Sequence, residues 1–165
     1  MKKFIVMIML LLPLGMVAQE SKIAYVNTGE IFNNMPEVSA METEMAALKT
    51  QIQNYLKQLY DDYTQKNSDL IAQRDSLSEN ILKLRVQDID NLRDRIENYQ
   101  MVAEQEQQET YEKLFTPIQE KLFKAIEEVG EENGYTYILN PQAILYKSKS
   151  SIDATEQVKA KLGIK

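Results

Sequence analysis

The sequence contains no Cys, no His and no Trp, and only 5 Gly and 4 Pro among its 165 residues. Without Cys and His, disulfides, thiolate nucleophiles, imidazole acid–base catalysis and the usual zinc sites are excluded. The only Gly-x-x-x-Gly spacing, from Gly130 to Gly134, has no following Lys and does not match a phosphate-binding loop. The sequence therefore predicts no enzyme, no metal site and no cofactor.

The N-terminus has the pattern of a secretory signal peptide. Lys2 and Lys3 precede an apolar run over residues 4–14, and small Ala18 precedes a polar stretch. A membrane-spanning helix needs about 20 apolar residues, and this run is shorter. We expect cleavage after residue 18 and export from the cytoplasm, with an uncleaved N-terminal anchor as the alternative.

The charge is acidic. Without Lys2 and Lys3 the chain has 17 basic and 25 acidic residues, a net charge of -8. Nucleic acids and anionic membrane surfaces are bound by clustered cations, so neither is an expected partner. Asp61 with Asp62, and Asp88 with Asp90, are the closest carboxylate pairs, but neighbouring helical positions diverge by about 100° and do not converge on one ion. An enzyme with a carboxylate-only site is the weakest alternative.

Residues 37–116 contain neither Pro nor Gly and are rich in Gln, Glu, Leu, Asp and Lys, a composition that favours helix throughout. Two runs of apolar residues recur at steps close to three and four, as in a coiled-coil seam. A turn is signalled near residues 74–79, where Ser76 and Glu79 have the spacing of a capping box. We predict an antiparallel helical hairpin over 37–116, which we call the arm. Its predicted seam residues are Val38, Met41, Met45, Leu48, Ile52, Tyr55 and Leu59, then Ile81, Leu84, Ile89, Leu92, Ile96, Tyr99 and Ala103.

The remaining residues, 19–36 and 117–165, form the predicted body. Strands are expected at 22–27, 135–140 and 143–147, the returning helix should continue past Pro117, and a last helix should run over 154–162 with Asp153 as its N-cap. A body this small has a marginal core, and its sheet edges are open. We therefore predict an α+β fold that oligomerises through the body. The predicted body contacts are Ile23, Tyr25, Val26, Phe32, Ile138, Leu139, Ile144, Leu145 and Tyr146.

The arm is richer in Tyr and Met than in Phe. Tyr combines a large apolar face with a polar tip, and Met adapts to irregular partners, so such a surface suits loose contact with unfolded chains. The predicted contact residues are Tyr60, Tyr63, Tyr99 and Met101. The Arg residues gather toward the tip, where Lys83, Arg85, Arg93 and Arg95 are candidates for contacts with acidic client segments or with the phosphate groups of lipids. The alternative is ordinary helix-face ion pairs, such as Asp90 with Arg93.

The order of these segments resembles a known family. Residues 22–37, which include Lys22-Ile-Ala-Tyr-Val-Asn27 and Met35-Pro36-Glu37, are similar to the first strand and loop of the Skp/OmpH family of periplasmic chaperones. Residues 117–139 resemble that family's return into the body, and residues 143–146 and 152–162 resemble its last strand and terminal helix.

The resemblance implies a homotrimer in the periplasm whose arms enclose a cavity. It implies an ATP-independent chaperone that holds unfolded outer-membrane β-barrel proteins and prevents their aggregation before insertion. The best-known members are strongly basic, and this acidic chain departs from them. A structural coiled-coil scaffold of the cell envelope is the main alternative, since it would share both the export signal and the hairpin.

Overall fold

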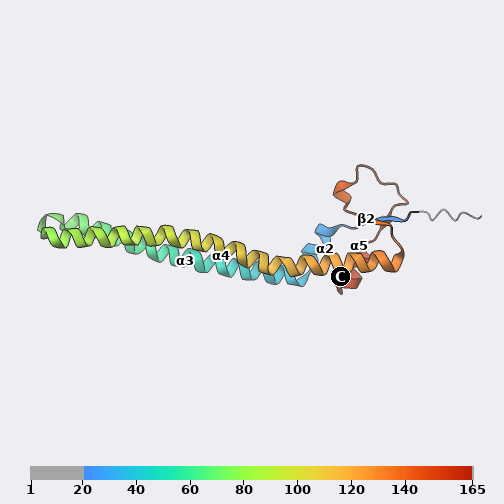
Figure 1. Ribbon diagram of the computed structural model, residues 1–165, viewed down its shortest axis with the longest axis horizontal. Helices are drawn as coiled ribbons and strands as arrows, with labels where there is room; N and C mark the ends of the chain where they lie inside the picture. Colours follow the sequence, from blue (N-terminus) through green and yellow to red (C-terminus); the bar gives the residue numbers. More distant parts are fainter. Residues whose placement is uncertain (1–20, 165) are drawn as a thin grey trace, which may run out of the picture.

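The computed structural model describes residues 21–164 and consists of a long two-helix arm and a small body (Figure 1). The predicted signal peptide lies outside the described residues. The α+β fold with a long protruding hairpin is confirmed. The elements in chain order are β1 (Ile23–Tyr25), α2 (Thr28–Asn34), α3 (Pro36–Gln73), the 3₁₀ helix η1 (Arg74–Ser76), α4 (Glu79–Asn133), β2 (Tyr137–Leu139), the 3₁₀ helix η2 (Pro141–Ala143), β3 (Ile152–Asp153) and α5 (Thr155–Leu162).

The sheet has three short strands in the order β2-β1-β3, and both pairings are parallel. Ile23 pairs with Tyr137 and Ala24 with Ile152. Parallel neighbours need a crossover connection, and the whole arm serves as the crossover between β1 and β2.

The prediction of a strand at residues 143–147 is wrong, because the third strand is β3. Residues 140–151 connect β2 to β3, and since these strands run in the same direction the connection must cross back over the sheet. Within this crossing loop, η2 occupies residues 141–143 and the following residues have no strand partner in a single copy of the chain. This segment therefore forms no strand in a single copy of the chain, although its composition is typical of one.

The core of the body lies between the inner face of the sheet and the helices α2, α4 and α5. Val26, Ile31, Met35 and Val158 are its largest fully buried side chains. Burial of each such side chain contributes about 1.5–3 kcal/mol. The core continues along α4 through Ile118, Leu122, Ala125 and Val129. It therefore ties the N-terminal strand, the arm's return and the C-terminal helix into one unit.

Side chains and glycines cap the helices of the body. The two glycine caps lie where the sequence predicts, whereas helix α2 was not predicted. The Asn27 side chain accepts a hydrogen bond from Glu30 N at the start of α2. Asp153 Oδ1 accepts one from Thr155 N, but α5 begins one residue later than predicted, so its N-cap residue is Ala154 and not the predicted Asp153. Gly134 and Gly163 end α4 and α5 in the left-handed conformation, with φ of 64° and 71°.

The arm consists of α3 and the first part of α4, joined at the tip by residues 74–78. Pro36 occupies the first turn of α3, where its missing N–H costs nothing. The predicted capping box is wrong. Ser78 is the N-cap residue of α4, and the Ser76 hydroxyl instead donates to Gln73 O at the end of α3.

The seam between α3 and α4 is a single line of buried residues: Val38, Met41, Ile52, Leu59, Ile89, Leu92, Ile96, Ala103 and Ile118. Two details differ from the prediction. Leu56 is half-buried where Tyr55 was expected, and near the tip Leu82 is half-buried while Ile81 and Leu84 are exposed. Seven-residue steps back from Ile96 and Ile89 lead to Leu82, so the regular repeat holds up to the tip.

Pro117 lies inside α4, which continues through it as predicted. A proline removes one backbone hydrogen bond of the helix. Leu114 and Phe115 before the proline, and Leu122 and Ala125 after it, pack in or against the body core, so packing on both sides supports the interrupted turn. In the described part of the chain, no helix is long and apolar enough to cross a membrane.

Candidate functional site

The middle of the arm carries the predicted contact residues, and the structure divides them into two kinds. Tyr60 is 45% exposed and Met101 is 64% exposed. Tyr63 and Tyr99 are half-buried along the seam, and the Tyr99 ring meets the Tyr55 ring edge-on, with centroids 4.5 Å apart. Tyr99 therefore joins the two helices, whereas Tyr60 and Met101 present apolar surface to the solvent.

Polar side chains also link the two helices at this level. Gln100 Nε2 donates to Tyr60 Oη at 3.1 Å, and Arg95 Nη2 donates to Tyr55 Oη at 3.4 Å. Such exposed bonds each contribute little, because water competes for both partners. The centre of the arm is thus held by a thin apolar seam and by polar contacts that water can replace.

A groove of about 880 Å³ crosses the arm beside these residues. Ile52 and Leu56 of α3 line one side, and α4 supplies the rest of the lining between Asp94 and Gln107. Met101 stands at this groove, so one exposed apolar residue named from the sequence belongs to a larger concave surface. The groove could not be predicted from sequence periodicity. The polar residues that flank the seam have the same pattern as ordinary solvent-exposed residues of a helix.

The four basic residues predicted near the tip do not form one cluster. Arg93 pairs with Asp90 at 3.5 Å, which is the helix-face ion pair expected as the alternative. Arg95 is directed to Tyr55. Lys83 is exposed, and Arg85 lies beside Asp69 and Asp88 in a small groove near the tip. The structure does not bring the four cations together around one anion.

The predicted contacts of the body are also of two kinds. Val26 is buried in the core of its own chain, and Phe32 and Ile138 are half-buried against that core. The others lie on the outer side of the sheet or on the crossing loop, where Ile23, Leu139, Leu145 and Tyr146 are exposed and Tyr25 and Ile144 are half-buried. Lys147 of the loop lies 3.9 Å from the centre of the Tyr25 ring, so the loop passes over this outer face.

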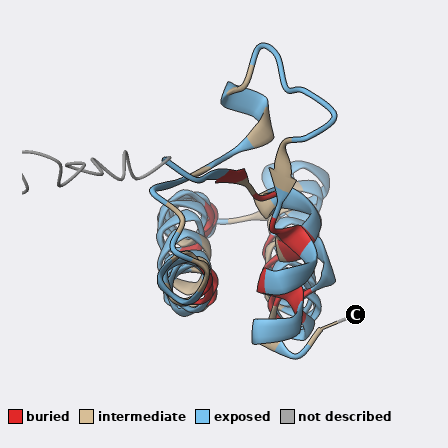
Figure 2. Ribbon diagram, turned by 90° about the vertical axis from the view of Figure 1, so that its right-hand side faces the viewer, coloured by how far each residue is buried: buried red, intermediate tan, exposed pale blue. Residues whose placement is uncertain are grey.

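Tyr137 is a further exposed residue of the body that was not predicted from the sequence to be a contact residue. It is 61% exposed and shares the outer face with Leu139, because alternate residues of β2 point to the same side. Leu145 and Tyr146 are the most exposed large apolar side chains of the described chain. Viewed from the body end, the loop that carries them stands clear of the helices (Figure 2). An uncovered apolar surface of this kind is typical of a site that contacts another molecule.

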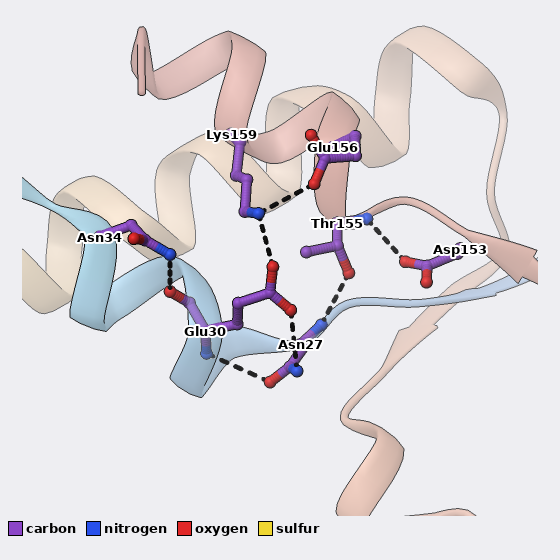
Figure 3. A network of polar contacts seen from close by, with 7 residues as sticks. All are labelled: Asn27, Glu30, Asn34, Asp153, Thr155, Glu156 and Lys159. Carbon is purple, nitrogen blue, oxygen red and sulfur yellow. Dashed lines mark hydrogen bonds and ion pairs between the residues drawn. The ribbon is translucent and has the colours of Figure 1, made fainter. Parts of the chain in front are cut away.

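A polar network on the other side of the body joins the N-terminal and C-terminal segments (Figure 3). The Lys159 ammonium group contacts Glu30 at 2.5 Å and Glu156 at 2.9 Å. Thr155 Oγ1 accepts a hydrogen bond from Asn27 N at 3.0 Å. The hydrogen bonds that Lys159 donates to Glu156 and Glu30 raise its pKa above the ordinary lysine value. The network fixes α5 against α2, which closes the core.

Two carboxyl groups, those of Asp153 and Glu37, have lowered pKa values. Burial opposes ionisation of Asp153, but hydrogen bonds from Thr155 outweigh it and lower the pKa of this carboxyl. At the root of the arm, the hydrogen bond from Lys121 lowers the pKa of Glu37, so the Glu37–Lys121 ion pair bridges α3 and α4. Within residues 21–164, no group of three or more acidic side chains is placed to hold a metal ion.

The fold defines a class of protein with a small body and a long arm. The antiparallel helical arm is inserted between two parallel strands of the body, and the body has uncovered apolar surface. The sequence matches the family described as "Outer membrane protein (OmpH-like)" over residues 22–162. The chain belongs to the OmpH-like family, as the sequence resemblance indicates.

A solved structure has the same fold. It is described as an OmpH-like outer membrane chaperone from Caulobacter crescentus CB15, with a TM-score of 0.76 and 13% sequence identity. The alignment covers 86% of this chain and 83% of that one. A comparison with curated proteins gives no match.

Proposed function

We propose that this protein is an ATP-independent holdase of the periplasm. In this proposal it binds unfolded outer-membrane β-barrel proteins between the arms of a homotrimer and prevents their aggregation before insertion. Membership of the OmpH-like family supports the proposal. The solved structure with the same fold is itself described as an outer membrane chaperone.

The arm is the observation that carries the proposal. It is a two-helix hairpin with one narrow seam, and both Tyr60 and Met101 are exposed beside a groove. Unfolded chains offer many small apolar segments, and weak contacts to several such surfaces add up to stable but reversible holding. Release then needs no nucleotide and no catalytic residue.

The body supports the homotrimer. Its sheet has free edges at β2 and β3, and Tyr137 and Leu139 form an exposed apolar face next to the crossing loop. A second copy would bury this face and pair an edge strand, and both effects are favourable. Residues 144–146, which have no strand partner within one chain, are the proposed contact segment.

Native mass spectrometry of residues 19–165 tests both parts of the proposal. The chain is measured alone and after mixing with a urea-unfolded outer-membrane barrel protein diluted into buffer. We expect a trimer that gains the mass of one client, and suppressed light scattering of the diluted client. A trimer that ignores the client would favour an envelope scaffold instead, and a monomer would contradict the assembly.

A Leu145→Asp variant locates the assembly surface. Leu145 is fully exposed in one copy, so a charge there does not disturb the fold of the single chain. In a trimer interface the same charge would be desolvated without a partner, which is strongly unfavourable. We expect dissociation, with unchanged helical circular dichroism. Ile71→Asp, at a 70% exposed arm position, is the matched control and should remain trimeric.

A further inference from the structure

The groove in the middle of the arm has an apolar floor. Ile52 and Ala103 are buried in it, Leu56 is half-buried, and Met101 is largely exposed beside them. An apolar side chain entering from a partner would therefore meet aliphatic carbon and a flexible thioether. Such a lining accepts side chains of varied shape.

The rim of the same groove is negatively charged. Asp94, Glu97 and Glu104 line it together with amide side chains, and no Lys or Arg is among its lining residues. Steps of three and seven residues place the three carboxylates along one face of α4. Arg93 and Arg95, which are close in sequence, are directed to Asp90 and Tyr55. Within residues 21–164, none of the three carboxylates forms an ion pair.

Like charges on one helix face repel each other, and here no side chain of the described chain compensates for this. A ligand that brings cations to the rim would remove the repulsion and form charge-assisted contacts at the same time. An acidic ligand would add to the repulsion. Charge complementarity therefore selects a cationic occupant, and the floor selects one that also carries apolar side chains.

We propose that this groove binds extended client segments in which Lys or Arg alternates with apolar residues. The proposal rests on the holdase function and specifies which client segments the arm prefers. The lining of α4 from Asp94 to Gln107 spans about 20 Å, at roughly 1.5 Å per helical residue. About six residues of extended chain cover this length, since each adds roughly 3.3 Å. Gln100, also in the lining, donates a hydrogen bond to the Tyr60 hydroxyl, so this exposed residue lies next to the groove lining.

Fluorescence anisotropy with three labelled 12-residue peptides tests the preference on the assembled mature protein. The peptides share alternating Leu and Val positions and differ only between them, where they carry Lys, Gln or Glu. The test variant combines Asp94→Asn, Glu97→Gln and Glu104→Gln. The matched control combines Glu42→Gln, Glu106→Gln and Glu120→Gln, which removes the same charge from exposed positions outside the groove.

We expect the Lys peptide to bind the wild type about tenfold more tightly than the Glu peptide, since each exposed charge pair adds a small increment. The groove variant should lose this preference while its affinity for the Gln peptide stays unchanged, and the control variant should keep it. Equal binding of the Lys and Glu peptides, a preference retained by the groove variant, or a preference lost by the control variant would overturn the proposal. If the wild type suppresses barrel-protein aggregation without this preference, only the groove proposal fails. If it binds no peptide and suppresses no aggregation, the holdase proposal fails as well.

Discussion

The body and the arm are built from one chain but are stabilised in different ways. In the body, strands and helices from both ends of the sequence enclose a core whose largest side chains are almost completely buried. In the arm, two helices share a single line of buried residues, and most other side chains are in water. A region with few buried contacts opens locally at lower cost than a packed core. We therefore expect the body to keep its geometry and the arm to open locally more easily.

Substituting the body core should have the largest effect. Ile31 is 0% exposed, and Ile31→Ala removes buried carbon and leaves a cavity. We expect unfolding to become easier by about 3 kcal/mol, measured by urea denaturation followed by circular dichroism. Ile71→Ala, on the exposed surface of α3, is the control and should change stability by less than about 0.5 kcal/mol. Equal losses in the two variants would show that the burial of Ile31 does not stabilise the body.

Removing a buried side chain from the arm should destabilise the arm and leave the body unaffected. Leu92 is 4% exposed in the seam, and Leu92→Ala should cost about 2 kcal/mol, at the low end for a buried leucine because a thin seam can close over the gap. Hydrogen exchange should accelerate at amides of the arm between residues 52 and 103, while the body retains its protection. Faster exchange throughout the body would show that the two regions unfold as one unit.

Changes at Tyr60 and Tyr63 should weaken holding while leaving the trimer intact. The double variant Tyr60→Ser and Tyr63→Ser removes two aromatic rings from the predicted client surface. We expect several-fold weaker suppression of client aggregation, because each lost aromatic contact removes a share of the total binding. The trimer should persist in native mass spectrometry. Unchanged holding would contradict the assignment of these two residues.

The smallest effect should appear in alkaline solution and only in the body. The raised pKa of Lys159 means that its favourable contacts are fully present below the ordinary lysine pKa of about 10.4 and are lost as pH rises through the higher folded value. Thermal stability should therefore fall above about pH 10.5. Lys159→Met should show a shallower fall over that range, and Lys49→Met, on the exposed face of the arm, should follow the wild type. Identical profiles for Lys159→Met and the wild type would contradict the role of the network.

The helices of the fold could be predicted from local features of the sequence. A stretch without Pro or Gly predicts continuous helix, and left-handed Gly134 and Gly163 end two helices where the sequence indicates. The seam was predictable except at Ile81 and Leu84, which are exposed, and at Tyr55, which packs against Tyr99 but is itself partly exposed. At these positions apolar residues stand next to the true seam, and composition does not distinguish neighbouring faces of one helix.

The sheet and the candidate site were predictable only in part. Residues 143–147 have the composition of a strand, but a strand needs a neighbour, and in one copy the parallel order β2-β1-β3 gives them none. Met101 was identified as an exposed contact residue, whereas the groove beside it was not. A groove depends on which side chains of α3 face those of α4, and each sequence segment alone lacks that information.

Local sequence signals determined the helical arm, the small apolar body and the glycines that end α4 and α5, because helix propensity, periodicity and turn chemistry act over a few residues. Tertiary structure decided the pairing of β3 with β1, the closure of the core by α5 through Lys159, and the acidic groove across the arm. These features join residues that are far apart in the chain. They exist only when packing brings such residues together, because contacts between distant residues are set by the free energy of the whole fold.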